Sequence, residues 1–397
     1  MPMAIDSPRA EERHQRPGTT GSAVFLDKGI SRRQLLLWAG GMSCPPVWAA
    51  PAQGTTLLAA WQQQDEQRIG LLAVSGAHWS VQRSLAVPTR AHGLWSEPGG
   101  GLLAVARRPG DWLLRWHPRT GKTQWHWIDG DRRFNGHVIA GAGGATLWTT
   151  ETDLDSAQGM LGVREAQSLE KTDEWATHGM DPHQLLALPQ PAGDLPAGTL
   201  MVANGGIPTL PETGRSKRAL NRMDSSLVAL DPANGALRGQ WRLNDPHLSI
   251  RHLAWNPVSG TLGIALQAEH PDKTVQHAAP VLAVWDGRTL RTAEPPPALA
   301  GYGGDVCALP GGGFAVSCPR AHRLALFNAT GHCTGTIEHT EAYALAANRQ
   351  QWWLASSRSE AGLLHSGVAA NASPPLKARH AGKGSLQIDN HWILPRV

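Results

Sequence analysis

Residues 92–127 read HGLW-SEPGGG-LLAVA-RRPGD-WLLRW-HPRTGK-TQWHW and hold four short apolar runs. The segments between the runs are rich in glycine and proline, the residues that tight turns need. Short apolar runs separated by such turns predict antiparallel strands rather than helices. Four strands in one interval are the pattern of a single β-propeller blade.

The first of these runs recurs along the chain. Seven segments open an apolar stretch in the same way, and five of them begin with histidine. The segments begin at His92, His137, His183, His252, Asp305, Tyr343 and His391, in steps of 45, 46, 69, 53, 38 and 48 residues. A repeat of roughly 40 to 50 residues is typical of propeller blades. We therefore expect an all-β fold, a seven-bladed β-propeller whose inner strands line a central channel.

Strands from both ends of the chain are expected to complete this ring. Three strands fit between residues 54 and 92, and the C-terminal part supplies one more at 391–394. Pairing the N-terminal strands with the C-terminal strand in one blade closes the ring and leaves no exposed strand edge. Residues 51–397 are therefore predicted to form a single propeller domain.

The longest step between two segments holds an insertion of roughly 20 residues, at about 207–224. Long loops on a rigid scaffold often carry specificity. The insertion is therefore either a specificity loop or a passive surface excursion.

The first fifty residues resemble an export signal. A polar stretch leads to Ser31-Arg32-Arg33-Gln34-Leu35-Leu36-Leu37 and then to a modest apolar run that ends near residue 50. Paired arginines before a short apolar run are typical of twin-arginine signals. We expect a periplasmic protein from which residues 1–50 are removed, the alternative being an uncleaved N-terminal anchor. No later stretch approaches the roughly 18 apolar residues that a transmembrane helix needs.

Charge does not indicate a nucleic-acid partner. Residues 1–50 hold six basic and four acidic residues, which leaves 30 basic against 28 acidic residues in the rest of the chain. Nucleic-acid binding relies on a basic excess that neutralises phosphates, and this chain lacks one.

Three cysteines follow residue 50, at positions 307, 318 and 333. Cys307 and Cys318 flank the turn Pro310-Gly311-Gly312-Gly313 nearly symmetrically. They either face each other as a disulfide or remain buried free thiols.

A series of short sequence motifs, or words, runs through about residues 60–395. The words are Arg107-Arg108-Pro109-Gly110, Phe134-Asn135-Gly136-His137, Thr150-Glu151-Thr152-Asp153, Gly162-Val163, His178-Gly179, Pro182-His183, Ala203-Asn204-Gly205-Gly206-Ile207, Leu248-Ser249-Ile250-Arg251-His252-Leu253, Gly301-Tyr302 and Asp389-Asn390-His391. Their order and number resemble the DUF1513 family of exported bacterial proteins, which are commonly found near imelysin-type iron-uptake components. The resemblance implies a seven-bladed propeller that serves iron acquisition and has no defined biochemical activity. Gln184 and Leu210 replace a glutamate and a histidine of the family, so a metal role at those two positions is in doubt.

The five histidines that open strands are predicted to share one site. Residues in the same phase of successive inner strands converge at one mouth of a propeller channel. The metal ligands expected there are His92, His137, His183, His252 and His391. Neutral imidazole is a common ligand of copper and iron, so we predict a transition metal, iron or copper, or a chelate of it. The alternative is that each histidine caps its inner strand by bonding to the next blade.

Polar residues near the histidines are predicted to bind the rest of the ligand. Arg90 and Arg251 each lie close in sequence to a histidine and suit the carboxylates of a small chelator. Glu151 is either a partner that orients a histidine or an ordinary turn residue. Asn204 precedes two glycines, which let the backbone approach a ligand closely. Asp305 stands at the histidine position of its own blade.

Two other classes of function remain open. A metal-dependent propeller hydrolase or oxidase is disfavoured, because calcium-dependent propeller enzymes need a carboxylate-rich site. The sequence also contains no Gly-x-Ser-x-Gly or Cys-x-x-Cys-His motif. A protein-interaction scaffold would bind periplasmic iron-uptake proteins and need no metal. If the histidines do bind a cation, coupled protonation predicts that binding weakens in acid.

Overall fold

The computed structural model describes residues 55–75, 78–208, 219–294, 299–347, 352–356, 361–365, 376–380 and 386–395. Contacts divide the chain into Met1–Pro51 and Ala52–Val397, and every described residue belongs to the second unit. The predicted export signal, residues 1–50, lies outside the described residues. Within these ranges, no helix has the length and apolar character needed to cross a membrane.

Strands dominate the described chain, as the short apolar runs predict. In the first half they are β1 (Thr55–Gln63), β2 (Glu66–Ser75), β3 (His78–Val87), β4 (Ala91–Ser96), β5 (Leu102–Ala106), β6 (Trp112–Trp116), β7 (Thr123–Trp127), β8 (Arg132–Ala140), β9 (Thr146–Asp153), β10 (Gln158–Glu165), β11 (Lys171–Met180), β12 (Pro182–Ala187) and β13 (Leu200–Asn204). In the second half they are β14 (Ser226–Leu230), β15 (Leu237–Trp241), β16 (Leu248–Asn256), β17 (Thr261–Ala268), β18 (Leu282–Trp285), β19 (Leu290–Thr292), β20 (Asp305–Ala308), β21 (Phe314–Cys318), β22 (Arg323–Phe327), β23 (Cys333–Glu338), β24 (Leu345–Ala347), β25 (Trp352–Ser356), β26 (Ala361–His365), β27 (Leu376–His380) and β28 (Leu386–Ile393). Short helical turns are η2 (Leu220–Arg222), α2 (Lys273–Ala278) and η3 (Pro319–Ala321).

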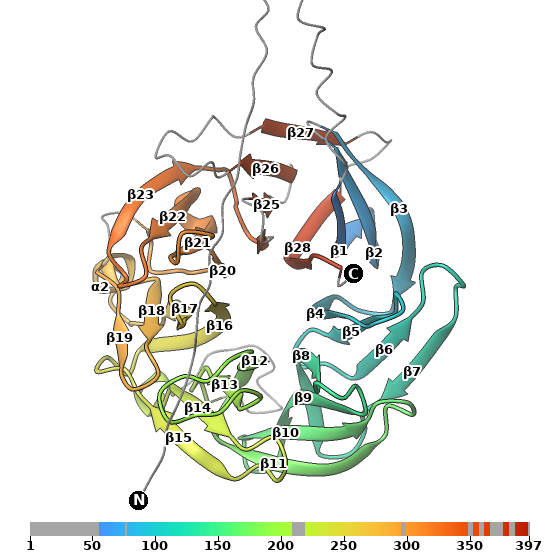
Figure 1. The fold of residues 1–397 in the computed structure, drawn as a ribbon, viewed down its shortest axis with the longest axis horizontal. Helices are drawn as coiled ribbons and strands as arrows, with labels where there is room; N and C mark the ends of the chain where they lie inside the picture. Colours follow the sequence, from blue (N-terminus) through green and yellow to red (C-terminus); the bar gives the residue numbers. More distant parts are fainter. Residues whose placement is uncertain are drawn as a thin grey trace, which may run out of the picture. The chain divides into compact units, whose positions relative to one another are not determined.

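Hydrogen bonding groups the described strands into six sheets that stand around a common axis (Figure 1). Five sheets have four strands each, which are β4–β7, β8–β11, β12–β15, β16–β19 and β20–β23. The sixth has eight strands in the order β24-β25-β26-β27-β3-β2-β1-β28. The inner strands contact one another in a closed cycle that runs through β4, β8, β12, β16, β20, β24 and β28 and returns to β4. The all-β propeller predicted from the repeat is confirmed.

The ring closes through strands from both ends of the chain. β1 pairs antiparallel with β2 and with β28, and β2 pairs with β3, so the predicted closure is confirmed. The prediction of seven separate blades is wrong, because the described strands form six sheets. The difference arises where β27 lies parallel to β3 through the pairs Arg379–His78 and His380–Trp79. This short ladder joins β24–β27 to the closing strands in one sheet.

The position of a strand in its sheet explains its burial. Middle strands pack against neighbouring sheets on both faces, so every residue of β5 is buried and the strand is a continuous apolar run. Along β23, exposed residues alternate with half-buried ones, because one face of the strand meets solvent. Large tryptophans fill the spaces between sheets, and Trp61, Trp112, Trp285 and Trp392 are among the most buried side chains.

The predicted insertion at about 207–224 is described only at its two ends. Ile207 is buried, and η2 leads into the buried Met223. The segment 209–218, which holds most of the basic residues of the insertion, lies outside the described residues.

Cys307, Cys318 and Cys333 are free thiols. Cys307 on β20 lies opposite Ala315 of β21, so it does not face Cys318 and no disulfide joins the two. Burial raises the pKa of both thiols, which keeps them protonated and unreactive.

Candidate metal centre

Each of the five predicted histidines lies where an inner strand slips in register against its neighbour. They are His92 on β4, His137 on β8, His183 on β12, His252 on β16 and His391 on β28. At the slip, two residues of β4, β12 or β16 lie opposite one residue of the paired strand, and in β8 and β28 three residues lie opposite one. Such a bulge disrupts the ladder locally and redirects a side chain. The bulges turn all five imidazoles toward one another.

Side chains of neighbouring inner strands stabilise the bulged backbone. Oε1 of Gln184 on β12 accepts a hydrogen bond of 2.7 Å from the backbone N–H of Leu253 on β16. Nδ2 of Asn135 on β8 donates to the carbonyl oxygen of Pro182 on β12 at 2.9 Å. Gln184, which replaces the glutamate of the family, therefore keeps a structural role as a hydrogen-bond acceptor.

Glycines allow the inner strands β4 and β8 to approach closely at the cluster. Gly136 has a φ of 98°, and a Cβ added there would lie 2.8 Å from Cδ2 of His92. A Cβ added at Gly93 would lie 2.3 Å from the carbonyl oxygen of Gly136. Neither position has room for a side chain, which explains why glycine stands beside His92 and His137.

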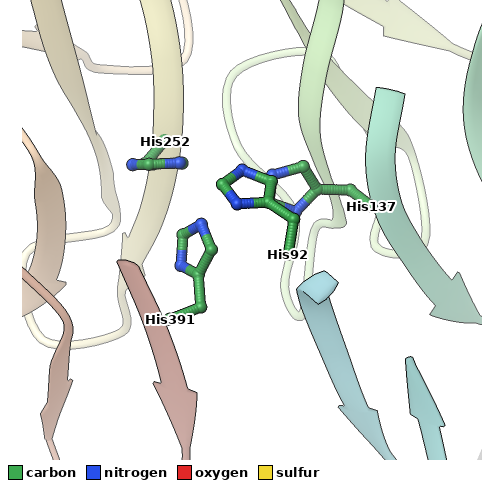
Figure 2. Close-up of side chains that lie close together, drawn as sticks. All are labelled: His92, His137, His252 and His391. Atoms are coloured by element: carbon green, nitrogen blue, oxygen red, sulfur yellow. The ribbon is translucent and has the colours of Figure 1, made fainter. Parts of the chain in front are cut away.

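The imidazole rings pack against one another, and Figure 2 shows four of them converging from four strands. Ring centroids are 4.4 Å apart for His252 and His391, and 4.5 Å apart for His391 and His92. The rings of His92 and His137 are 4.9 Å apart. One ligand nitrogen from each of these four residues lies within 4.8 Å of the others.

His183 completes the group of five. Its Nε2 lies 2.9 Å from Nε2 of His252 and 3.4 Å from Nε2 of His92. Its ring centroid is 4.8 Å from that of His137. The structure thus brings together all five histidines that the repeat predicts to share a site.

Asp305, predicted to stand in the same circle, lies beside two of the histidines. Its Oδ1 is 3.7 Å from Nδ1 of His252, and its Oδ2 is 3.8 Å from Nδ1 of His391. Burial raises the pKa of Asp305 to about 8, although two backbone N–H groups donate to the carboxylate. Asp305 is therefore protonated at neutral pH, and it lies beside the two rings but beyond hydrogen-bond distance of them.

The histidines are uncharged at neutral pH. Burial lowers the pKa of all five, and neighbouring histidines lower it further in four of them. For His391 the pKa falls to about 4, through burial and through the charges of Arg107 and Arg90. Neutral imidazole is the form that binds a metal ion.

Several buried ring nitrogens have no hydrogen-bond partner in the described part of the chain. Among them are Nδ1 of His92 and His183 and Nε2 of His137 and His391. Leaving a buried polar atom unpaired costs about 1–3 kcal/mol. An ion held by the cluster would bind such nitrogens and remove part of this cost. The unpaired nitrogens therefore indicate that the cluster fits a metal.

The two predicted ligand-binding arginines are both paired with carboxylates. Arg90 forms a bidentate ion pair with Asp389 on β28 and donates to Oδ1 of Asn390 at 3.1 Å. Nη1 of Arg251 lies 2.8 Å from Oδ2 of Asp181. Both arginines thus help to fix the bulged strands that carry the histidines.

Glu151 and Asn204 both contact residues of the sheet β8–β11. The carboxylate of Glu151 on β9 is fully buried, 2.7 Å from Nη2 of Arg164 and 3.4 Å from Nζ of Lys171. Nδ2 of Asn204 donates to the carbonyl oxygen of Thr177 at 2.8 Å. The structure therefore gives Glu151 a role within its own sheet and Asn204 a role between two sheets, rather than a place among the histidines.

A cavity of about 260 Å³ opens onto the cluster. His92, His183 and His252 line it, and the other lining residues are Arg107, Arg108, Asn135, Arg251, Gln267, Tyr302, Arg320 and Asn390. Of the four arginines, Arg251 alone is predicted from the sequence to bind the ligand. Arg107 and Arg108 belong to one of the sequence motifs shared with the family, but a motif by itself does not show where its side chains lie.

Comparison with known families identifies the chain. A family model described as a protein of unknown function, DUF1513, matches residues 85–395. The chain belongs to the DUF1513 family. The match spans the five histidines, Asp305 and the arginines of the cavity, and the resemblance found in the sequence is confirmed. No curated protein matches the chain in sequence.

Solved structures share the fold of this DUF1513 protein at low sequence identity. Virginiamycin B lyase from Staphylococcus aureus has a TM-score of 0.51 at 10% identity, over 72% of this chain and 84% of that chain. A streptogramin B lyase has a TM-score of 0.52 at 12% identity, over 77% and 94% of the two chains. A chain of a mitotic checkpoint complex has a TM-score of 0.50 at 12% identity, over 75% and 89%. At these identities the likeness shows the fold alone.

The replacement Gly136→Ala tests the close approach of β4 and β8. It introduces left-handed strain of about 1–2 kcal/mol and a contact with His92. Gly99→Ala is the matched control, because Gly99 has a φ of 83° but no atom within 4 Å of an added Cβ. We expect Gly136→Ala to lower the free energy of unfolding by at least about 1 kcal/mol more than the control, measured by urea unfolding. Equal losses would contradict the close approach.

Acid should destabilise the fold through the histidines. Each has a pKa below its ordinary value of 6.5 in the folded protein, so the unfolded chain takes up protons first as the pH falls. The stability contributed by the neutral rings is complete above about pH 6.5 and is lost as the pH falls below it, by up to about 1.4 kcal/mol per pH unit for each ring. For His391 this loss ends near pH 4. Asp305 changes the stability in the opposite direction. Its raised pKa lets the folded protein keep a proton up to about pH 8, so the stability it contributes falls as the pH rises toward 8.

This pH dependence is measured as the free energy of unfolding in urea at pH 6.5 and at pH 4.5. His391→Gln should make the loss of unfolding free energy between pH 6.5 and pH 4.5 smaller, since the variant lacks one of the groups that take up a proton on unfolding. His332→Gln, at an exposed position on the outer part of a sheet, should leave the loss unchanged. A wild-type loss that persists in full in His391→Gln would contradict the assignment.

Proposed function

We propose that this DUF1513 protein binds one transition-metal ion through His92, His137, His252 and His391. The observation that carries the proposal is a set of four buried imidazoles whose ligand nitrogens lie within 4.8 Å of one another. Metal–nitrogen bonds of about 2.0–2.1 Å bring ligand nitrogens to about 3–4 Å apart, so small ring rotations suffice. Imidazole suits zinc, copper, iron and nickel, whereas calcium and magnesium take oxygen ligands.

The neighbours of the four ligands have supporting roles in this proposal. Asp305 lies beside His252 and His391, where a small ring rotation would let it accept a hydrogen bond from either ring. His183 is half-buried and lines the cavity, so it faces whatever enters toward the ion. An ion at the centre would also satisfy ring nitrogens that are buried without a hydrogen-bond partner among the described residues.

Titration of the chelator-treated protein tests the metal site. We expect one equivalent of Zn(II), Cu(II), Fe(II) or Co(II) to bind and to raise the melting temperature, because an ion that binds the folded state alone stabilises it. His137→Ala and His391→Ala should each weaken binding by about tenfold or more, since each removes a ligand. Isothermal titration calorimetry and the visible absorption of bound Co(II) measure the affinity.

Two controls separate this site from others. His332→Ala changes an exposed histidine and should bind the ion like the wild type. Asp245, His247 and His270 form a second, less buried group of ligand atoms, so the stoichiometry is measured in a His270→Ala background. Equal affinity in His137→Ala, His391→Ala and His332→Ala would contradict the proposal and favour a scaffold without a metal.

We also propose that the ion is iron or copper and that the protein acts in the periplasm as an accessory to iron acquisition. The twin-arginine-like segment in residues 1–50 supports export in a folded state. The resemblance to exported proteins found near imelysin-type components supports the link to iron.

Elemental analysis tests this assignment on protein purified from the periplasm of its own host. We expect iron or copper near one equivalent in the wild type and strongly reduced metal in His137→Ala, because export of a folded protein lets the ion travel with it. Zinc at one equivalent, or recovery of the protein from the cytoplasm alone, would contradict this part of the proposal.

A further inference from the structure

The cavity in front of the histidines carries an excess of positive charge. Four arginines line it, and none of its described lining residues is a carboxylate. The described acidic groups near this lining are the buried Asp181 and Glu269, Asp305 beside His252, and Asp389, which pairs with Arg90 outside the lining. With Arg90 counted, five guanidinium groups stand against these four carboxylates.

Two of these arginines share a single carboxylate. Asp181 forms ion pairs with Arg108 through one oxygen and with Arg251 through the other. The side chain of Arg251 is 4% exposed, and its Nε is buried without a hydrogen-bond partner among the described residues.

The fourth arginine lies on the open side of the cavity. Arg320 in η3 is exposed, and its guanidinium lies 4.0 Å from the ring centroid of Tyr302, another lining residue. Stacking on an aromatic ring holds a guanidinium in place and leaves its N–H groups free to bind an anion. The cavity thus offers donors at its buried end and at its mouth.

We propose that this cavity binds a small polycarboxylate anion, whose carboxylates pair with the arginines and whose inner end reaches the histidine cluster. Guanidinium groups bind carboxylates through paired hydrogen bonds. Separate arginines suit a ligand with several separate carboxylates better than a phosphate or sulfate with a single anionic centre. At about 260 Å³ the cavity is smaller than the roughly 300–1,000 Å³ of pockets for drug-sized ligands, which favours a small anion.

Charge couples this anion to the proposed metal. A divalent cation placed among neutral histidines beside four arginines meets repulsion, which an anion in the cavity offsets. Each ligand should therefore strengthen the binding of the other, as linkage requires. This coupling rests on the proposed function, whereas the anion site rests on the arginines alone.

Calorimetric titration of chelator-treated protein with citrate tests the anion site. We expect saturable binding that weakens as salt is added and falls by about tenfold or more in Arg320→Ala, with partial recovery in Arg320→Lys. Arg107→Gln should weaken binding as well, which provides a second variant in the same cavity. Arg288→Ala removes an exposed arginine in the turn between β18 and β19 and should bind citrate like the wild type.

Further measurements separate the anion from the metal and from other anions. His137→Ala, which should lose the ion, should still bind citrate, so the two proposals can fail independently. Citrate and Co(II) together should raise the melting temperature by more than the sum of their separate effects. Phosphate binding as tightly as citrate, or equal citrate affinity in Arg320→Ala and Arg288→Ala, would overturn the anion proposal. Loss of the Co(II) spectrum on adding citrate would overturn joint binding.

Discussion

The candidate site depends on extra residues in the inner strands. A regular strand directs successive side chains to opposite faces of its sheet, where neighbouring sheets would enclose them in apolar core. The bulges in β4, β8, β12, β16 and β28 break this alternation at each histidine. Gln184 and Asn135 then bond backbone groups of the adjacent inner strand, so the bulges of β16 and β12 are each held by a neighbouring strand. The arrangement of the rings is therefore a property of the whole ring of sheets.

The electrostatics of the site follow from the burial of the histidines next to permanently charged arginines. Imidazoles that remain neutral can stand together without repulsion, whereas five imidazoliums in the same space could not. The arginines keep their charge in comparable surroundings because their ordinary pKa is far above neutrality, and Asp181 and Asp389 compensate several of them. The site thus places neutral nitrogen ligands beside cationic groups, a combination that suits a metal accompanied by an anion.

The sequence predicts the ring and the cluster because both depend on periodicity. Residues at equivalent positions of a repeat must converge near the axis, and this is true of the five histidines and of Asp305. The ladder between β27 and β3 was not predictable, since it rests on two residue pairs between distant segments. Glu151 was equally ambiguous, because its position in a strand does not reveal that Arg164 lies on the next one. The arginines of the cavity come from the loop after β5, from β16 and from η3, which the fold alone brings together.

Closure of the ring sets the order in which the centre can be assembled. His391 is carried by β28, and β28 joins β1, which is made first among the described strands. A growing polypeptide on the ribosome therefore holds His92, His137, His183 and His252 long before their last companion exists. The complete four-histidine set arises only after β28 has been made, so a metal of the kind proposed would enter the finished domain rather than the growing chain.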